Sequence, residues 1–331
     1  MKKKKQKSYE NKRITMMEMN YEKTLRDVYK QLDMQYKSVL SDIEKELEKW
    51  EEIRANDKRP STFGYSEEKH LKESKKAIEL LLNELAENEY KLLDRAMRDL
   101  YAKDLLDMKK LELEYLQWRD DNELAYMLEY ALKNTSFEDF QQRKELFERF
   151  STGIASRTDS IKMVEHMLRQ PIPTKSLSQD IWYKGCQGKG YGERIAIRGV
   201  QLQNEINQAI NSMYAQGKSY EYATKRIAER LGVDSYYAKR LVANECRIAE
   251  STATVNHYSD TMGVKYFKRS TTGDKDVCPI CKKHKDDIYT SEELKRNPFK
   301  SMLHVGDRCV LMPLSSKRGA ELYNSPKNTN R

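Results

Sequence analysis

The sequence predicts a mainly α-helical protein. Its N-terminal half is expected to be long and coiled-coil-like, and its C-terminal half to be a helical domain that ends in a small β module. Charged residues make up 34% of the 331 residues and apolar residues only 38%, while glycine and proline are scarce. Such a composition is typical of long, largely exposed helices. We expect an elongated helical region in residues 1–170, a three-helix core in 171–263, and a short-stranded module with a basic tail in 264–331.

The first region begins with a helix whose apolar residues recur at a mean spacing of about 3.5 residues, the period of a coiled coil. This seam consists of Ile14, Met17, Tyr21, Leu25, Val28, Leu32, Tyr36, Val39, Ile43, Leu47, Trp50 and Ile53. Pro60 and Gly64 interrupt the pattern, and a second helix is expected from Glu67 to Lys133. A hairpin of two helices within one chain is the simpler interpretation. An oligomerisation coil between chains is the alternative.

Two shorter helices and a linker follow. Candidate capping residues and a phenylalanine-rich face predict a helix over 134–150, and another is expected at 160–169. The proline pair in PIPTKS, residues 171–176, predicts the boundary of the region. Several glycines lie between residues 185 and 192, but they are not followed by Gly-Lys-Ser/Thr. We therefore interpret them as a flexible turn rather than a nucleotide-binding loop.

Three helices are expected in the middle region. An apolar stripe at 206–214 predicts the first, Ser219 caps the second, which Gly232 closes, and Asp234 caps the third. Glu245 lies within the apolar stripe of the third helix, where a carboxylate needs a partner. We expect a structural ion pair or hydrogen bond. A general base is the alternative, although that helix face offers no histidine or nucleophile beside it.

The five cysteines point to metal binding rather than to disulfides. Their number is odd, and the start MKKKKQK lacks the apolar stretch of a signal peptide, so reduced thiols are expected. Cys278 and Cys281 form one pair on a predicted turn, and His304 and Cys309 form a second pair after an excursion of 22 residues. Three thiolates and one imidazole complete a tetrahedral site of the kind that zinc occupies in structural roles.

Short strand-like runs flank these four residues, at 264–270 and directly after Cys309. This arrangement predicts a zinc-ribbon-like module, in which the metal replaces a core that is too small to form. His284 and Asp307 are alternative ligands. A thioredoxin-like redox couple at the C-x-x-C and a set of inert thiols are the competing interpretations.

The formal net charge of +9 is concentrated near the cysteines. Residues 262–331 contain 15 Lys or Arg against 8 Asp or Glu, a balance of +7. Together with the basic N-terminal arm, this favours non-specific contact with double-stranded DNA or with an acidic protein surface. The chain contains no run of about 18 apolar residues, so no membrane partner is expected.

Five stretches occur in a recognisable order: LSQDIW, GKSYEYATKRIAERLG, LVANECRIAESTATVNHYSDTMGVKYF, DKDVCPIC and a terminal His-x4-Cys. This order resembles the phage head morphogenesis, or minor head protein, family, which includes proteins similar to protein F of phage Mu. Of the Arg-Thr-Glu signature of that family only Glu245 is kept, whereas D-x-x-x-C-x-x-C matches at Asp274, Cys278 and Cys281. Asp307 stands where the family usually has a cysteine.

The resemblance covers roughly residues 177–313. It implies a non-enzymatic capsid protein in the virion, at the head interior or the portal vertex, which passes through the host cytoplasm during assembly. The implied partners are the portal protein, other capsid or scaffold proteins, and packaged DNA. Two alternatives remain: a toxin or transferase enzyme joined to such a domain, and a zinc-ribbon protein that binds nucleic acid.

Overall fold

The computed structural model describes residues 2–56, 63–133, 144–145, 148–150, 152–154, 156–169, 190–216, 219–273, 275, 277–325 and 328. The chain forms two compact units built from interleaved segments. Unit 1 comprises Met1–Thr24, Met97–Ile181 and Asn244–Arg331, and unit 2 comprises Leu25–Ala96 and Trp182–Ala243. The predicted boundary at residues 170 and 171 lies outside the described residues. Both sides of the predicted boundary at 263 belong to unit 1.

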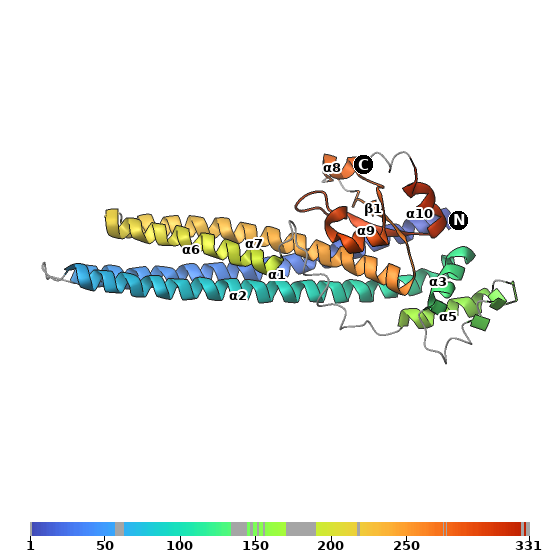
Figure 1. The fold of residues 1–331 in the computed structure, drawn as a ribbon, viewed down its shortest axis with the longest axis horizontal. Helices are drawn as coiled ribbons and strands as arrows, with labels where there is room; N and C mark the ends of the chain where they lie inside the picture. Colours follow the sequence, from blue (N-terminus) through green and yellow to red (C-terminus); the bar gives the residue numbers. More distant parts are fainter. Residues whose placement is uncertain are drawn as a thin grey trace. The chain divides into compact units, whose positions relative to one another are not determined.

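The described part of unit 2 is built from parts of four long helices: α1 (Lys2–Asn56), α2 (Phe63–Tyr115), α6 (Tyr191–Gln216) and α7 (Tyr220–Asn256). Within this unit they run side by side (Figure 1). The seam predicted for α1 is buried in this unit at Val28, Leu32, Tyr36, Ile43 and Leu47. Tyr36 Oη lies 3.3 Å from Glu89 Oε2 of α2, so the two helices are in contact. The intramolecular hairpin is therefore present in the structure.

A buried polar cluster, which we call the tetrad, takes one residue from each of these helices: Tyr36, Glu89, Arg198 and Asp234. Tyr36 Oη donates to Asp234 Oδ2 at 2.5 Å, and Arg198 Nε lies 3.0 Å from the same carboxylate. The Arg198 guanidinium also pairs with both oxygens of Glu89. Burial raises the pKa of Glu89, and the charge of Arg198 opposes this shift. Within the tetrad, the positive charge of Arg198 offsets the negative charges of two buried carboxylates, those of Glu89 and Asp234.

The tetrad explains why the predicted break between two helices at Gly232 and Asp234 is wrong. Helix α7 passes through both positions without interruption. Asp234 does not cap a helix because its carboxylate is buried against Tyr36 and Arg198. Gly232 is exposed within the helix, where glycine costs about 1 kcal/mol relative to alanine and is tolerated. Tertiary contacts thus outweigh both local signals.

The second predicted helix ends earlier than expected. Helix α2 stops at Tyr115 and is followed by a 3-10 turn, η1 (Leu116–Trp118), and by α3 (Asp121–Lys133). The Asp120 carboxylate accepts a hydrogen bond of 2.8 Å from the backbone N–H of Glu123, so it caps α3. The helix expected near residue 160 is confirmed as α5 (Arg157–Arg169). Most of the predicted helix 134–150 lies outside the described residues, as do the linker 171–176 and most of the glycine-rich segment.

Two further expectations concern the N-terminus and membranes. Helix α1 begins at Lys2, so residues 2–7 of the basic N-terminal stretch are helical. Among the described residues, no helix combines the length and apolar character that a membrane crossing requires.

Unit 1 contains a small antiparallel sheet with strand order β2-β1-β3. Its strands are β1 (Tyr266–Ser270), β2 (Ile288–Thr290) and β3 (Val310–Leu314). Helix α7 leads into this sheet through a π-helical turn, η4 (His257–Thr261). Short helices connect and follow the strands: α8 (Pro279–Lys283), α9 (Ser291–Arg296), the 3-10 turn η5 (Pro298–Ser301) and α10 (Ser316–Tyr323). The predicted small β module is confirmed, and β2 was not predicted.

His257 is buried in unit 1 at 3% exposure. Burial lowers its pKa to about 3, and the positive charges of Arg13, Lys109 and Arg119 act in the same direction. The folded protein therefore keeps this imidazole neutral, whereas the unfolded chain binds a proton below pH of about 6.5. Protonation of His257 in the unfolded chain therefore lowers the free energy of unfolding as the pH falls from about 6.5 towards 3, and it has no such effect above that range.

We expect the unfolding free energy of the wild type to fall, relative to His257→Gln, by up to about 1.4 kcal/mol per pH unit between pH of about 6 and 4. Urea unfolding followed by circular dichroism across this range measures the difference. The exposed His166 provides a control, because His166→Gln also removes a histidine without touching this buried environment. A difference between wild type and His257→Gln that is independent of pH would contradict the assignment.

Candidate metal centre

The first two candidate ligands are placed by the start of α8. Cys278 is the N-cap residue, Pro279 follows at the first helical position, and Cys281 lies in the first turn. The backbone N–H of Cys281 donates to Cys278 Sγ at 3.3 Å. Both thiols consequently lie on the same side of the turn, as the C-x-x-C spacing predicts.

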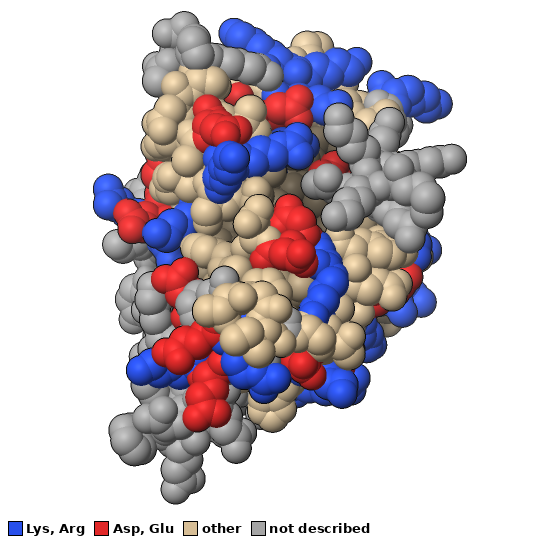
Figure 2. Space-filling model, turned by 90° about the vertical axis from the view of Figure 1, so that its right-hand side faces the viewer, with Lys and Arg blue, Asp and Glu red and all other residues tan. Residues whose placement is uncertain are grey.

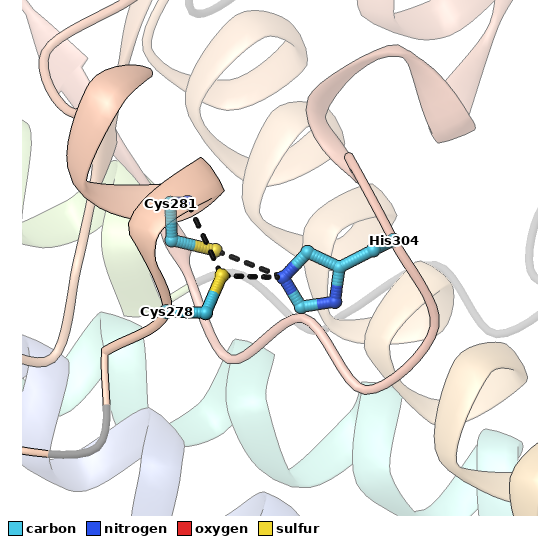
Figure 3. A group of neighbouring side chains, drawn as sticks. All are labelled: Cys278, Cys281 and His304. Atoms are coloured by element: carbon cyan, nitrogen blue, oxygen red, sulfur yellow. Dashed lines mark hydrogen bonds between the residues drawn. The ribbon is translucent and has the colours of Figure 1, made fainter.

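His304 meets this pair from the loop between η5 and β3. Its Nε2 atom lies 3.1 Å from Cys278 Sγ and 3.1 Å from Cys281 Sγ, and the three side chains point toward one another (Figure 3). Its other ring nitrogen, Nδ1, lies 2.9 Å from the carbonyl oxygen of Val305. A proton on Nδ1 is held by this carbonyl, so Nε2 is free to coordinate a metal. Metal-binding histidines are commonly oriented in this way.

Cys309 belongs to a second, overlapping group with Asp307 and Cys281. The donor atoms of Cys278, Cys281 and His304 lie within 4.8 Å of one another, and so do those of Cys281, Asp307 and Cys309. Cys281 is common to both groups and is 4% exposed. The four residues predicted as ligands are therefore brought into one continuous cluster.

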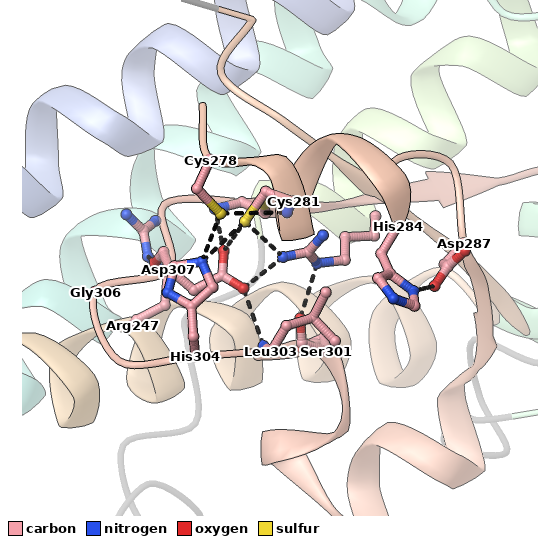
Figure 4. A network of polar contacts seen from close by, with 12 residues as sticks. Arg247, Cys278, Cys281, His284, Asp287, Ser301, Leu303, His304, Gly306 and Asp307 are labelled. Atoms are coloured by element: carbon pink, nitrogen blue, oxygen red, sulfur yellow. Dashed lines mark hydrogen bonds and ion pairs between the residues drawn. The ribbon is translucent and has the colours of Figure 1, made fainter. Parts of the chain in front are cut away.

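The Asp307 carboxylate is held by several hydrogen-bond donors (Figure 4). Its Oδ1 accepts from the backbone N–H of Cys309 at 2.8 Å, and its Oδ2 accepts from that of Leu303 at 3.1 Å. The guanidinium of Arg269, on β1, pairs with Oδ2 and lies 3.3 Å from Cys281 Sγ. These contacts fix the position of the Asp307 carboxylate, which also belongs to a group of possible metal donors with Cys281 and Cys309.

Two buried arginines fix the loop that carries His304 and Cys309. Arg269 donates through Nε to the carbonyl of Ser301 at 3.0 Å, and Arg247 of α7 donates through Nε to the carbonyl of Asp307 at 3.0 Å. Both arginines are at most 1% exposed. No sequence pattern predicts either contact, since each joins residues at least 32 positions apart.

The thiols differ in their readiness to ionise. The N–H of Cys281 lowers the pKa of the half-buried Cys278 thiol to about 7. Burial raises the pKa of both Cys281 and Cys309, and the Arg269 hydrogen bond opposes this shift at Cys281. Metal binding at this cluster must therefore displace thiol protons, as is usual for cysteine sites.

His284 lies apart from the cluster. Its Nδ1 atom is 3.0 Å from Asp287 Oδ2, and Figure 4 places this pair away from the two thiols. Of the remaining cysteines, Cys246 is buried in α7 and Cys186 lies outside the described residues. Of these two histidines, His304 belongs to a group of donors that could hold a metal ion, whereas His284 does not.

The cluster fits a metal ion by the chemistry of its donors. Cysteine sulfur and an oriented imidazole nitrogen are common metal donors, and the neighbouring guanidinium offsets the negative charge of the thiolates. The arrangement can hold a metal ion. No model of a protein family, no curated protein and no solved structure matches this chain.

Proposed function

We propose that the metal is zinc and that its role is structural. Four protein donors, Cys278, Cys281, His304 and Cys309, leave no coordination position for a substrate or an attacking water. Zinc held there ties α8 to the loop before β3. A metal that links short elements in this way is a common source of stability in a small module.

We further propose that the chain is a minor head protein of a phage, which acts without catalysis at the portal vertex. One observation supports this most directly: two of the stretches that resemble the family, far apart in sequence, contact each other. Asn244 Oδ1 accepts from the backbone N–H of Gly306 at 3.3 Å, beside the bond from Arg247 to the Asp307 carbonyl. The helix signature and the terminal His-x4-Cys thus form a single structural feature, as expected if both belong to one ancestral module.

Glu245, the residue retained from the helix signature, is buried at 4% exposure. It has a polar or electrostatic partner within the chain. This favours the structural interpretation of Glu245 over a general base. It also favours the non-enzymatic function over the toxin or transferase alternative.

The charge distribution favours weak rather than strong binding to DNA. Several basic residues of the C-terminal segment are paired with carboxylates, including Lys268 with Asp286 at 3.6 Å and Arg308 with Glu18 at 3.0 Å. On the described surface seen in Figure 2, Lys and Arg are intermixed with Asp and Glu. Paired and intermixed cations attract phosphates less than a continuous basic groove does.

The test is co-expression with the portal protein encoded by the same genome. A tagged chain is expected to retain the portal protein through affinity purification and gel filtration. Filter binding at several salt concentrations tests whether the chain binds duplex DNA. Binding to DNA is expected to be weak and to disappear as the salt concentration rises. Failure to retain the portal protein, or tight DNA binding that persists at high salt, would contradict the proposal.

A further inference from the structure

Helix α7 carries an exposed stripe in unit 2 whose members recur at alternating steps of four and three residues. We call it the α7 stripe; it consists of Tyr222, Arg226, Glu229, Val233, Tyr236 and Arg240, of which Arg240 is half-buried and the others are exposed. Tyr222, Val233 and Tyr236 are exposed to 41%, 44% and 58%. The opposite face of the helix is buried in unit 2 at Ala223, Ile227, Leu231, Asp234 and Ala238. The stripe is therefore a second seam on a helix that already has a core-facing side.

The spacing is that of the contact positions of a coiled coil, which recur every 3.5 residues on average. Within the stripe, Arg226 Nη1 donates to Tyr222 Oη at 3.2 Å, and the Arg240 guanidinium lies 5.5 Å from the centre of the Tyr236 ring. Each arginine is thus held on the stripe by a tyrosine one turn away. Tyrosine and arginine are the residue types that contribute most to protein interfaces.

We propose that a second copy of this chain binds the α7 stripe, with the two α7 helices antiparallel about a two-fold axis near residue 231. This axis places Tyr222 opposite Arg240, Arg226 opposite Tyr236, and Glu229 opposite Val233 of the second copy. Each of these three pairings between facing residues, which we call layers, occurs twice, as a two-fold interface requires. The order of residues along the stripe makes it complementary to itself, since every arginine faces a tyrosine.

The physical basis of the contact is four arginine–tyrosine pairs and two central Val233 side chains. Guanidinium groups stack favourably on aromatic rings, most strongly when both are removed from water. The stripe covers 18 residue steps, or about 27 Å of helix. One helix face of this length buries less than the roughly 800 Å² per chain of a standard interface. The dimer is therefore weak and forms at high protein concentration.

Sedimentation equilibrium of the full chain, over a concentration series up to about 1 mM, measures this association. The wild type is expected to pass from monomer to dimer. Val233→Glu places a carboxylate opposite Glu229 of the second copy, and it is expected to weaken association roughly tenfold or more. Adding Glu229→Lys to Val233→Glu restores opposite charges in both central layers, so the double variant is expected to dimerise again.

Leu80→Glu is the matched control, because Leu80 is an exposed apolar residue, at 62%, on α2 of the same unit. It is expected to leave the association unchanged. Circular dichroism of each variant checks that the helices remain folded. A wild type that stays monomeric, or a Val233→Glu variant that dimerises as the wild type does, would overturn the proposal. Failure of the double variant to recover dimerisation would overturn the antiparallel pairing.

Discussion

His304→Gln is expected to abolish zinc binding and to make residues 277–314 sensitive to protease, whereas His284→Gln is expected to keep both properties of the wild type. His304 Nε2 lies 3.1 Å from two thiols, and His284 instead contacts Asp287. The two variants remove the same side chain from the same module, so they separate loss of a ligand from loss of a histidine. Structural zinc contributes on the order of 10 kcal/mol to the folding of small metal modules.

The measurements are zinc content per chain after gel filtration and the pattern of limited proteolysis. About one equivalent of zinc is expected for wild type and His284→Gln. Cys281→Ser should behave as His304→Gln does, because Cys281 belongs to both donor groups. Equal zinc content in the two histidine variants would refute the assignment of His304, and metal-free wild type with protected residues 277–314 would refute the zinc centre itself.

Arg198→Met is expected to destabilise the protein by about 3–5 kcal/mol, since it leaves Glu89 and Asp234 buried without their cation. Both carboxylate residues are 2% exposed. Adding Glu89→Gln to Arg198→Met is expected to recover part of this loss, because it removes one of the unpaired charges. The recovery distinguishes an electrostatic effect from a simple loss of packing.

Arg230→Met serves as the comparison in the same unit. Arg230 lies 3.1 Å from Glu205, whose side chain is 46% exposed, so this pair is expected to contribute only about 0–1 kcal/mol. Urea unfolding followed by circular dichroism measures all three variants against the wild type. Similar losses for Arg198→Met and Arg230→Met would show that the tetrad has no special role in stability.

Sequence patterns predicted those parts of the fold that depend on local spacing. The apolar seam of α1 follows from its period, and β1 follows from its aromatic and branched residues. The break within α7 was wrongly predicted because Asp234 and Gly232 look like helix-end signals. Only the contacts of Asp234 with Tyr36 and Arg198 reveal its structural role. Strand β2 has three residues, too few for a reliable periodic signal.

Local spacing likewise predicted the candidate ligands of the metal site, but not the residues that hold them in place. The C-x-x-C pair and the His-x4-Cys pair are visible in the sequence because their members lie close together along the chain. The arginines that hold the site together are not, because Arg247 and Arg269 reach Asp307 across 60 and 38 residues. No spacing rule links such partners, and many of the 61 Lys and Arg residues in the chain would have been equally plausible.

The tetrad also bears on how the four helices of unit 2 find one alignment. An apolar seam that repeats every seven residues looks much the same after one helix slides by a repeat, a shift of about 10 Å. A hydrophobic core alone therefore admits several alignments of similar free energy. Arg198 can reach Glu89 and Asp234 together in only one of these alignments. Sliding one helix along another would leave these three charges unpaired in an apolar environment. The tetrad thus selects one register from a repeating set.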